Sequence, residues 1–162
     1  MTTIVTRTIH PPTIDPAEIA HAVNVIVGDG NVCEVRALEA LMPGDRFPGV
    51  YAGYFNSIDP LVTAVCRLRQ ARGVYATMNP VTPAVLARAN NRLRRAGRGT
   101  TTSDEDVTGR RWLLVDIDPV RPAGVSASDE EREAAVQRAA MIRDALRAEG
   151  WPDPVEACSG NG

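Results

Sequence analysis

The chain contains 162 residues, of which 44% are hydrophobic and 23% are charged, and its formal net charge is −2. These values are typical of a soluble globular protein with one domain, or with one domain and a small lobe. No run approaches the roughly 20 apolar residues of a membrane span, and the N-terminus lacks a secretory pattern. We therefore expect no membrane partner and a cytoplasmic location. Cys33, Cys66 and Cys158 are too far apart to predict a zinc site or a disulfide framework.

The N-terminal third predicts one helix, one strand and one long loop. Residues 1–13 form an irregular lead-in, and Asp15 then caps a helix that ends at Gly28. Residues 32–38 predict a strand. Residues 41–58 are rich in glycine, proline and aromatic side chains, which predicts a loop. Its aromatic residues either pack on the body of the protein or stack on nucleic-acid bases.

Two further helices and a strand follow. Asp59 starts the second helix, and residues 74–78 form a strand that ends at an Asn-Pro pair. The third helix begins at Pro83 and places three arginines on one face, which is either a solvated basic surface or a stripe that contacts phosphates. These arginines are Arg88, Arg92 and Arg95. Residues 97–109 are polar and bounded by glycines, which predicts a mobile loop.

Residues 110–119 have the sequence Arg-Arg-Trp-Leu-Leu-Val-Asp-Ile-Asp-Pro, which predicts a buried strand that ends in two carboxylates. Side chains alternate along a strand, so Asp116 and Asp118 should share one face, about 6.5 Å apart. Such carboxylates repel unless a cation lies between them, and Mg²⁺ binds carboxylates while leaving positions open for phosphate oxygens. Two ions about 3.5–4 Å apart would suit nucleotidyl transfer. The alternative is a pair of solvated aspartates before Pro119.

The C-terminal part predicts the longest helix and a last strand. A capping box begins the helix at Ser128, and Gly150 ends it. Residues 154–157 predict a strand parallel to the aspartate strand. This arrangement would bring a small-residue turn beside the aspartates, where backbone N–H groups can approach a phosphate. The turn consists of Ser159, Gly160, Asn161 and Gly162. The order of elements predicts an α/β (α+β) fold.

Five segments of this chain, in this order, resemble the catalytic domain of archaeo-eukaryotic-type DNA primases. The most similar proteins are primases and primase-polymerases of phages, plasmids and mobile elements. The segments are residues 73–80, 111–122, 126–131, 150–152 and 159–162. The resemblance covers residues 31–162, whereas residues 1–30 form the lead-in and the first helix.

The resemblance implies an RNA-recognition-like palm with a smaller N-terminal α/β unit. It also implies that Asp116 and Asp118 hold two catalytic Mg²⁺ or Mn²⁺ ions and that the turn at residues 159–162 binds the nucleotide. In the family this turn leads to a histidine and a later acidic residue. The present sequence ends at Gly162, before the positions of both residues. Cys158 stands where relatives often carry aspartate. On the basis of this resemblance we expect the chain to be the N-terminal part of a catalytic domain, incomplete at its C-terminus and inactive alone.

The sequence thus predicts a DNA primase or primase-polymerase, a nucleotidyltransferase that makes primers for DNA replication. Its partners would be a single-stranded DNA template and NTP or dNTP. The resemblance leaves open whether a helicase domain or protein is a further partner. Arg88, Arg92 and Arg95 are the candidate nucleic-acid contacts. Two alternatives remain: a non-catalytic module that binds single-stranded nucleic acid, and a structural replication-initiation domain without a metal.

Overall fold

The computed structural model describes residues 14–28, 30–122 and 124–157. The chain divides into two compact units, Met1–Leu113 and Leu114–Gly162, and each is described by itself. Together the described residues form a mixed α/β structure of the α+β type, in which one antiparallel sheet is accompanied by three α-helices. None of the helices in these three ranges is long and apolar enough to cross a membrane.

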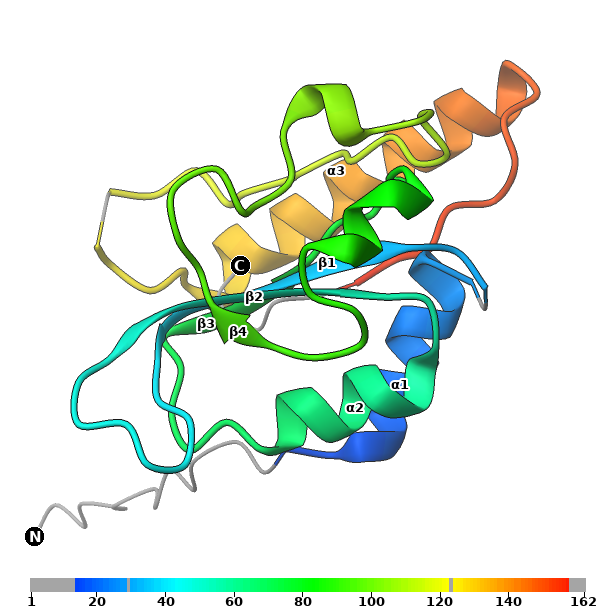
Figure 1. The fold of residues 1–162 in the computed structure, drawn as a ribbon. Helices are drawn as coiled ribbons and strands as arrows, with labels where there is room; N and C mark the ends of the chain where they lie inside the picture. The colour runs from blue at the N-terminus through cyan, green and yellow to red at the C-terminus, as the bar shows by residue number, and fades with distance from the viewer. Residues whose placement is uncertain (1–13, 29, 123, 158–162) are drawn as a thin grey trace, which may run out of the picture. The chain divides into compact units, whose positions relative to one another are not determined.

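The first unit is built on a four-stranded antiparallel sheet in the order β3-β1-β2-β4 (Figure 1). The strands are β1 (Cys33–Ala40), β2 (Gly49–Phe55), β3 (Gly73–Ala76) and β4 (Arg94–Arg95). The strands predicted at residues 32–38 and 74–78 are thereby confirmed. Strand β2 lies inside the predicted loop at residues 41–58, so this part of the prediction is wrong.

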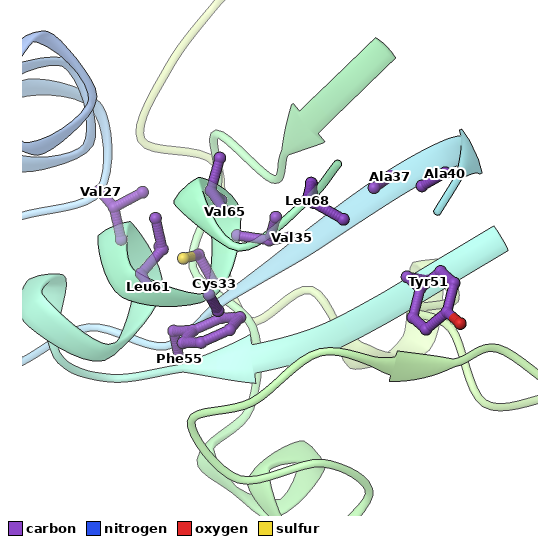
Figure 2. Packing of buried hydrophobic residues seen from close by; sticks show 11 residues of the cluster. Val27, Cys33, Val35, Ala37, Ala40, Tyr51, Phe55, Leu61, Val65 and Leu68 are labelled. Atoms are coloured by element: carbon purple, nitrogen blue, oxygen red, sulfur yellow. The ribbon is translucent and has the colours of Figure 1, made fainter. Parts of the chain in front are cut away.

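Helices α1 (Pro16–Ile26) and α2 (Ile58–Cys66) pack on each other and cover one face of the sheet (Figure 1). The predicted cap of α1 is confirmed, because an Asp15 carboxylate oxygen accepts a hydrogen bond of 2.8 Å from the Ala17 N–H. Apolar side chains that alternate along the strands point towards these helices. Figure 2 shows this core, in which Phe55 and Cys33 of the sheet meet Leu61 of α2.

The opposite face of the sheet carries a smaller apolar cluster and a 3-10 helix, η1 (Pro83–Ala87). Here the sequence predicted an α-helix reaching Arg95, and the structure contradicts it. After Arg88 the backbone turns to pair with β2: the Tyr54 N–H donates to the Ala89 carbonyl at 3.0 Å, and the Asn91 N–H donates to the Tyr54 carbonyl at 2.8 Å. Asn91 adopts a left-handed φ of 48°, which ends any helix.

The second unit contains helix α3 (Asp129–Ala148). Its predicted capping box is confirmed: the Glu131 N–H donates to Ser128 Oγ at 3.2 Å, and the Ser128 N–H donates to Glu131 Oε2 at 2.8 Å. Gly150, with a φ of 83°, follows the helix as predicted. None of the residues of α3 is buried.

The strands predicted around residues 112–118 and at residues 154–157 are absent from the described structure, and both stretches are irregular. A strand exists only through hydrogen bonds to a neighbouring strand, and none of the strand pairs in the described ranges includes these residues. The apolar side chains of Leu113, Leu114 and Val115 are therefore 64%, 68% and 44% exposed instead of buried. The prediction that the strand at residues 110–119 pairs in parallel with a strand at residues 154–157 is therefore wrong.

Candidate functional site

The two aspartates at the centre of the sequence prediction belong to the second unit. Asp116 and Asp118 are both exposed, whereas Ile117 between them is partly buried and Pro119 after them is buried. Both carboxylates are accessible to a ligand from solvent.

The donor chemistry of this pair fits a hard divalent cation. Mg²⁺ and Mn²⁺ prefer carboxylate oxygens, and Mg²⁺ sites commonly use one or two carboxylates, with water or phosphate oxygens completing the shell. Within the ranges that the structure describes, no three acidic, histidine or cysteine side chains gather into a metal-binding group. Two carboxylates fill only part of such a shell, so an ion at Asp116 and Asp118 would take its remaining oxygens from water or from a ligand such as a triphosphate. The predicted nucleotide-binding residues Ser159, Gly160, Asn161 and Gly162 lie outside the described residues.

The chain is anchored shortly before the aspartates, still within the first unit. The Asn79 side-chain oxygen accepts hydrogen bonds from the backbone N–H groups of Arg111 at 2.7 Å and Trp112 at 3.0 Å. The Trp112 indole N–H donates to the Ile26 carbonyl at 2.6 Å, and the Arg111 guanidinium donates to the Val27 carbonyl at 2.9 Å. Residues 111 and 112 thus satisfy carbonyls at the end of α1, which a helix leaves unpaired.

We call these contacts the Asn79 anchor. Sequence reasoning treated Asn79 only as the residue that ends a strand, and so it missed this role. The available signal was an asparagine before proline, since its side chain readily accepts backbone hydrogen bonds outside regular structure.

A buried charge lies on the face of the sheet that α1 and α2 leave uncovered. Glu34 on β1 is 2% exposed and forms two hydrogen bonds with Arg36, at 2.9 and 2.8 Å. Its carboxylate also accepts a bond of 2.9 Å from the Thr102 N–H. Burial alone would raise the pKa of Glu34, but the bonds from Arg36 and Thr102 outweigh it and hold the pKa below its ordinary value.

A second ion pair lies near the same face. Arg88 donates to both oxygens of the Asp106 carboxylate, at 2.8 and 2.9 Å, and to the Tyr54 hydroxyl at 3.3 Å. The bonds from Arg88, together with those from Ser103, lower the pKa of Asp106 to about 2. The Tyr54 hydroxyl in turn donates to the Thr100 carbonyl at 3.0 Å.

These contacts tie the segment at residues 100–106 to the sheet, although the sequence predicted a mobile loop there. Asp106 also completes a capping box with Ser103. Its pairing with Arg88 was missed, because the two residues are far apart in sequence and no local pattern connects them.

The three arginines predicted to form one helical stripe do not share a helix. Arg88 is held by Asp106, as described above. Arg95 lies in β4, where it donates to the Phe47 carbonyl at 2.9 Å, approaches Asp45 at 3.7 Å and lies over the Tyr51 ring. Arg92 is exposed in the turn between η1 and β4. The helical stripe is therefore wrong, whereas contact of each arginine with nucleic acid stays a prediction.

Comparison of the chain with protein-family models, with curated proteins and with solved structures found no match.

Proposed function

We propose that this chain forms part of a primase-type nucleotidyltransferase, in which Asp116 and Asp118 bind Mg²⁺ or Mn²⁺. The observation that carries the proposal is the exposed pair of carboxylates, two residues apart, directly after an apolar run and before Pro119. Five sequence segments resemble primases, and this pair lies in the second of them. The resemblance implies that the two carboxylates hold the catalytic metal ions. On the same reasoning, the sheet with α1 and α2 corresponds to the smaller N-terminal α/β unit of the family.

The chemistry of the site follows from its charge. Bound divalent ions would activate a 3′-hydroxyl and neutralise the triphosphate of an incoming NTP or dNTP. The chain itself contributes two carboxylates that bring the ions to the surface of the protein. The Asn79 anchor fixes the backbone of Arg111 and Trp112 at the end of the first unit. Primer synthesis on a single-stranded DNA template is the reaction that this site would serve.

Binding of Mn²⁺, measured by electron paramagnetic resonance with and without a nucleoside triphosphate, tests the site. Loss of a residue that only hydrogen-bonds to a metal ligand typically lowers metal affinity by roughly 10–100-fold. Asp116→Asn removes a proposed ligand itself, so it is expected to weaken Mn²⁺ binding at least as much. Asp104→Asn is the matched control, since it removes one exposed carboxylate elsewhere in the chain. Equal Mn²⁺ affinity in the wild type and both variants would refute the metal site.

Catalysis is tested separately, by template-dependent primer synthesis with the longest reading frame that contains this chain. Loss of product in the Asp116→Asn variant is expected. If the wild type binds single-stranded DNA but makes no product, and its metal binding does not depend on Asp116, the chain is instead a non-catalytic nucleic-acid-binding module.

A further inference from the structure

A groove with a volume of about 400 Å³ lies between helix α2 and the turn at residues 91–93. Helix α2 and the residue after it provide Asp59, Thr63 and Arg67, and the turn provides Arg92. Met42 and Leu93 add apolar surface, and both are only partly buried by the core behind them. The groove therefore combines two guanidinium groups with an apolar surface, and all of its residues belong to the first unit.

The wall that carries Arg92 is held tightly against the sheet. Gly53 of β2 lies so close to the Arg92 backbone that an added Cβ would come within 2.8 Å of the Arg92 carbonyl carbon. Asn91 adopts its left-handed φ of 48° while its side chain donates to the Asn56 side-chain oxygen at 2.8 Å. A backbone held in a sparsely populated conformation beside a groove is the kind of strain that clusters at binding sites.

The charges in the groove favour an anionic ligand. Among the described residues, neither Arg67 nor Arg92 takes part in an ion pair, whereas Arg88 and Arg95 do. Asp59 is the single carboxylate in the lining, so the groove carries a net positive charge. Arginine binds phosphate with two parallel hydrogen bonds, which makes a pair of free guanidinium groups well suited to a phosphodiester.

We propose that this groove binds a single strand of nucleic acid. A phosphate lies between Arg67 and Arg92, and the neighbouring base lies against Met42 and Leu93. The volume falls in the range of about 300–1,000 Å³ that is usual for sites holding a group of this size. The groove opens to solvent, so a strand can enter and leave it without a break in its backbone. It contains none of the residues of the proposed metal site, and strand binding here does not require catalysis.

The test is binding of a fluorescently labelled oligothymidylate, measured by anisotropy at several salt concentrations in the presence of EDTA. The double variant Arg67→Gln/Arg92→Gln should weaken binding and lower the log–log salt slope by about 0.7 for each lost phosphate contact. Arg72→Gln/Arg138→Gln removes the same charge from two exposed positions outside the groove lining and should leave the slope nearly unchanged. Thermal melting checks that each variant is folded.

A second variant probes the groove without removing an arginine. Thr63 is exposed on α2, and Thr63→Glu introduces a better helix former while it places a negative charge in the groove. It should weaken oligothymidylate binding as well. Equal losses of affinity in the Arg67→Gln/Arg92→Gln and Arg72→Gln/Arg138→Gln variants would show that binding depends only on the total charge, and this would overturn the proposal. Absence of binding by the wild type would overturn it as well. Equally tight binding of an oligo-aspartate peptide would make an acidic protein the occupant instead. Since EDTA removes divalent ions, none of these results depends on the metal site.

Discussion

Replacing Gly53 with alanine should destabilise the first unit, because the new methyl group has no space. An ideal Cβ there would lie 2.8 Å from the Arg92 carbonyl carbon, and closer still to its oxygen. Carbon atoms pack at about 3.5–4.0 Å, so the Arg92 backbone must move by roughly 1 Å. That movement strains the hydrogen bond from the Asn91 N–H to the Tyr54 carbonyl. Overpacking of this kind costs about 1–3 kcal/mol in the free energy of unfolding.

For a protein of this size, each kcal/mol lowers the melting temperature by roughly 2–4 °C, so Gly53→Ala should melt about 2–12 °C below the wild type. Gly49→Ala, on the same strand, is the control. Its Cβ would lie 2.7 Å from the Arg95 Cζ carbon and closer still to a guanidinium nitrogen, but this is the end of a flexible side chain, which can move aside by giving up its exposed hydrogen bond to the Phe47 carbonyl. Alanine at a compatible glycine position also gains about 0.4–1 kcal/mol. Melting is followed by circular dichroism, and equal melting temperatures for both variants would contradict the close approach of Gly53 and Arg92.

Two other substitutions test the anchor and the buried charge. Asn79→Ala removes the acceptor of the exposed Arg111 N–H and of the partly buried Trp112 N–H, so it should cost about 0.5–1.5 kcal/mol and speed their amide exchange. Asn79→Asp keeps an oxygen acceptor and should restore slow exchange, whereas equally fast exchange in both would contradict the anchor. The lowered pKa of Glu34 adds stability that is complete above its ordinary value of 4.5 and is lost as the pH falls through the lowered pKa. The urea concentration at the midpoint of unfolding should therefore decrease as the pH is lowered from 7 to 3. The Glu34→Gln variant should be less stable than the wild type at pH 7, and its midpoint should change less with pH. An equal change of midpoint with pH in the variant and the wild type would contradict this role of Glu34.

Sequence patterns predicted best those elements whose signals are local. Helix α3 begins at Ser128 because its capping box satisfies N–H groups of the first turn, and Gly150 can adopt the left-handed conformation that follows its end. The start of helix α1 is likewise predicted by Asp15 as the N-cap and Pro16 as the first helical residue. These interactions join residues a few positions apart, so they can be recognised without any knowledge of the fold.

The segment from Pro83 to Arg95 shows where local patterns fail. Its arginines repeat at helical spacing, but spacing contributes little free energy compared with pairing to a strand. The backbone of Ala89 and Asn91 bonds to Tyr54, and Arg88 turns to Asp106. Each partner lies at least 18 residues away in sequence. Neither contact could be predicted from one sequence without the fold.

The aspartate segment contains both kinds of information. Its chemistry depends on residue identity, and two carboxylates separated by one apolar residue are evident in the sequence. Its conformation depends on a partner strand, and among the described residues of the segment only Arg111 and Trp112 form hydrogen bonds. Residues 113–118 make no backbone hydrogen bonds in the described structure, so metal binding would have to fix this backbone itself, and the cost offsets part of the binding free energy. Consequently, we expect Asp116 and Asp118 to bind Mn²⁺ weakly by themselves, and more tightly when a triphosphate supplies further oxygen ligands.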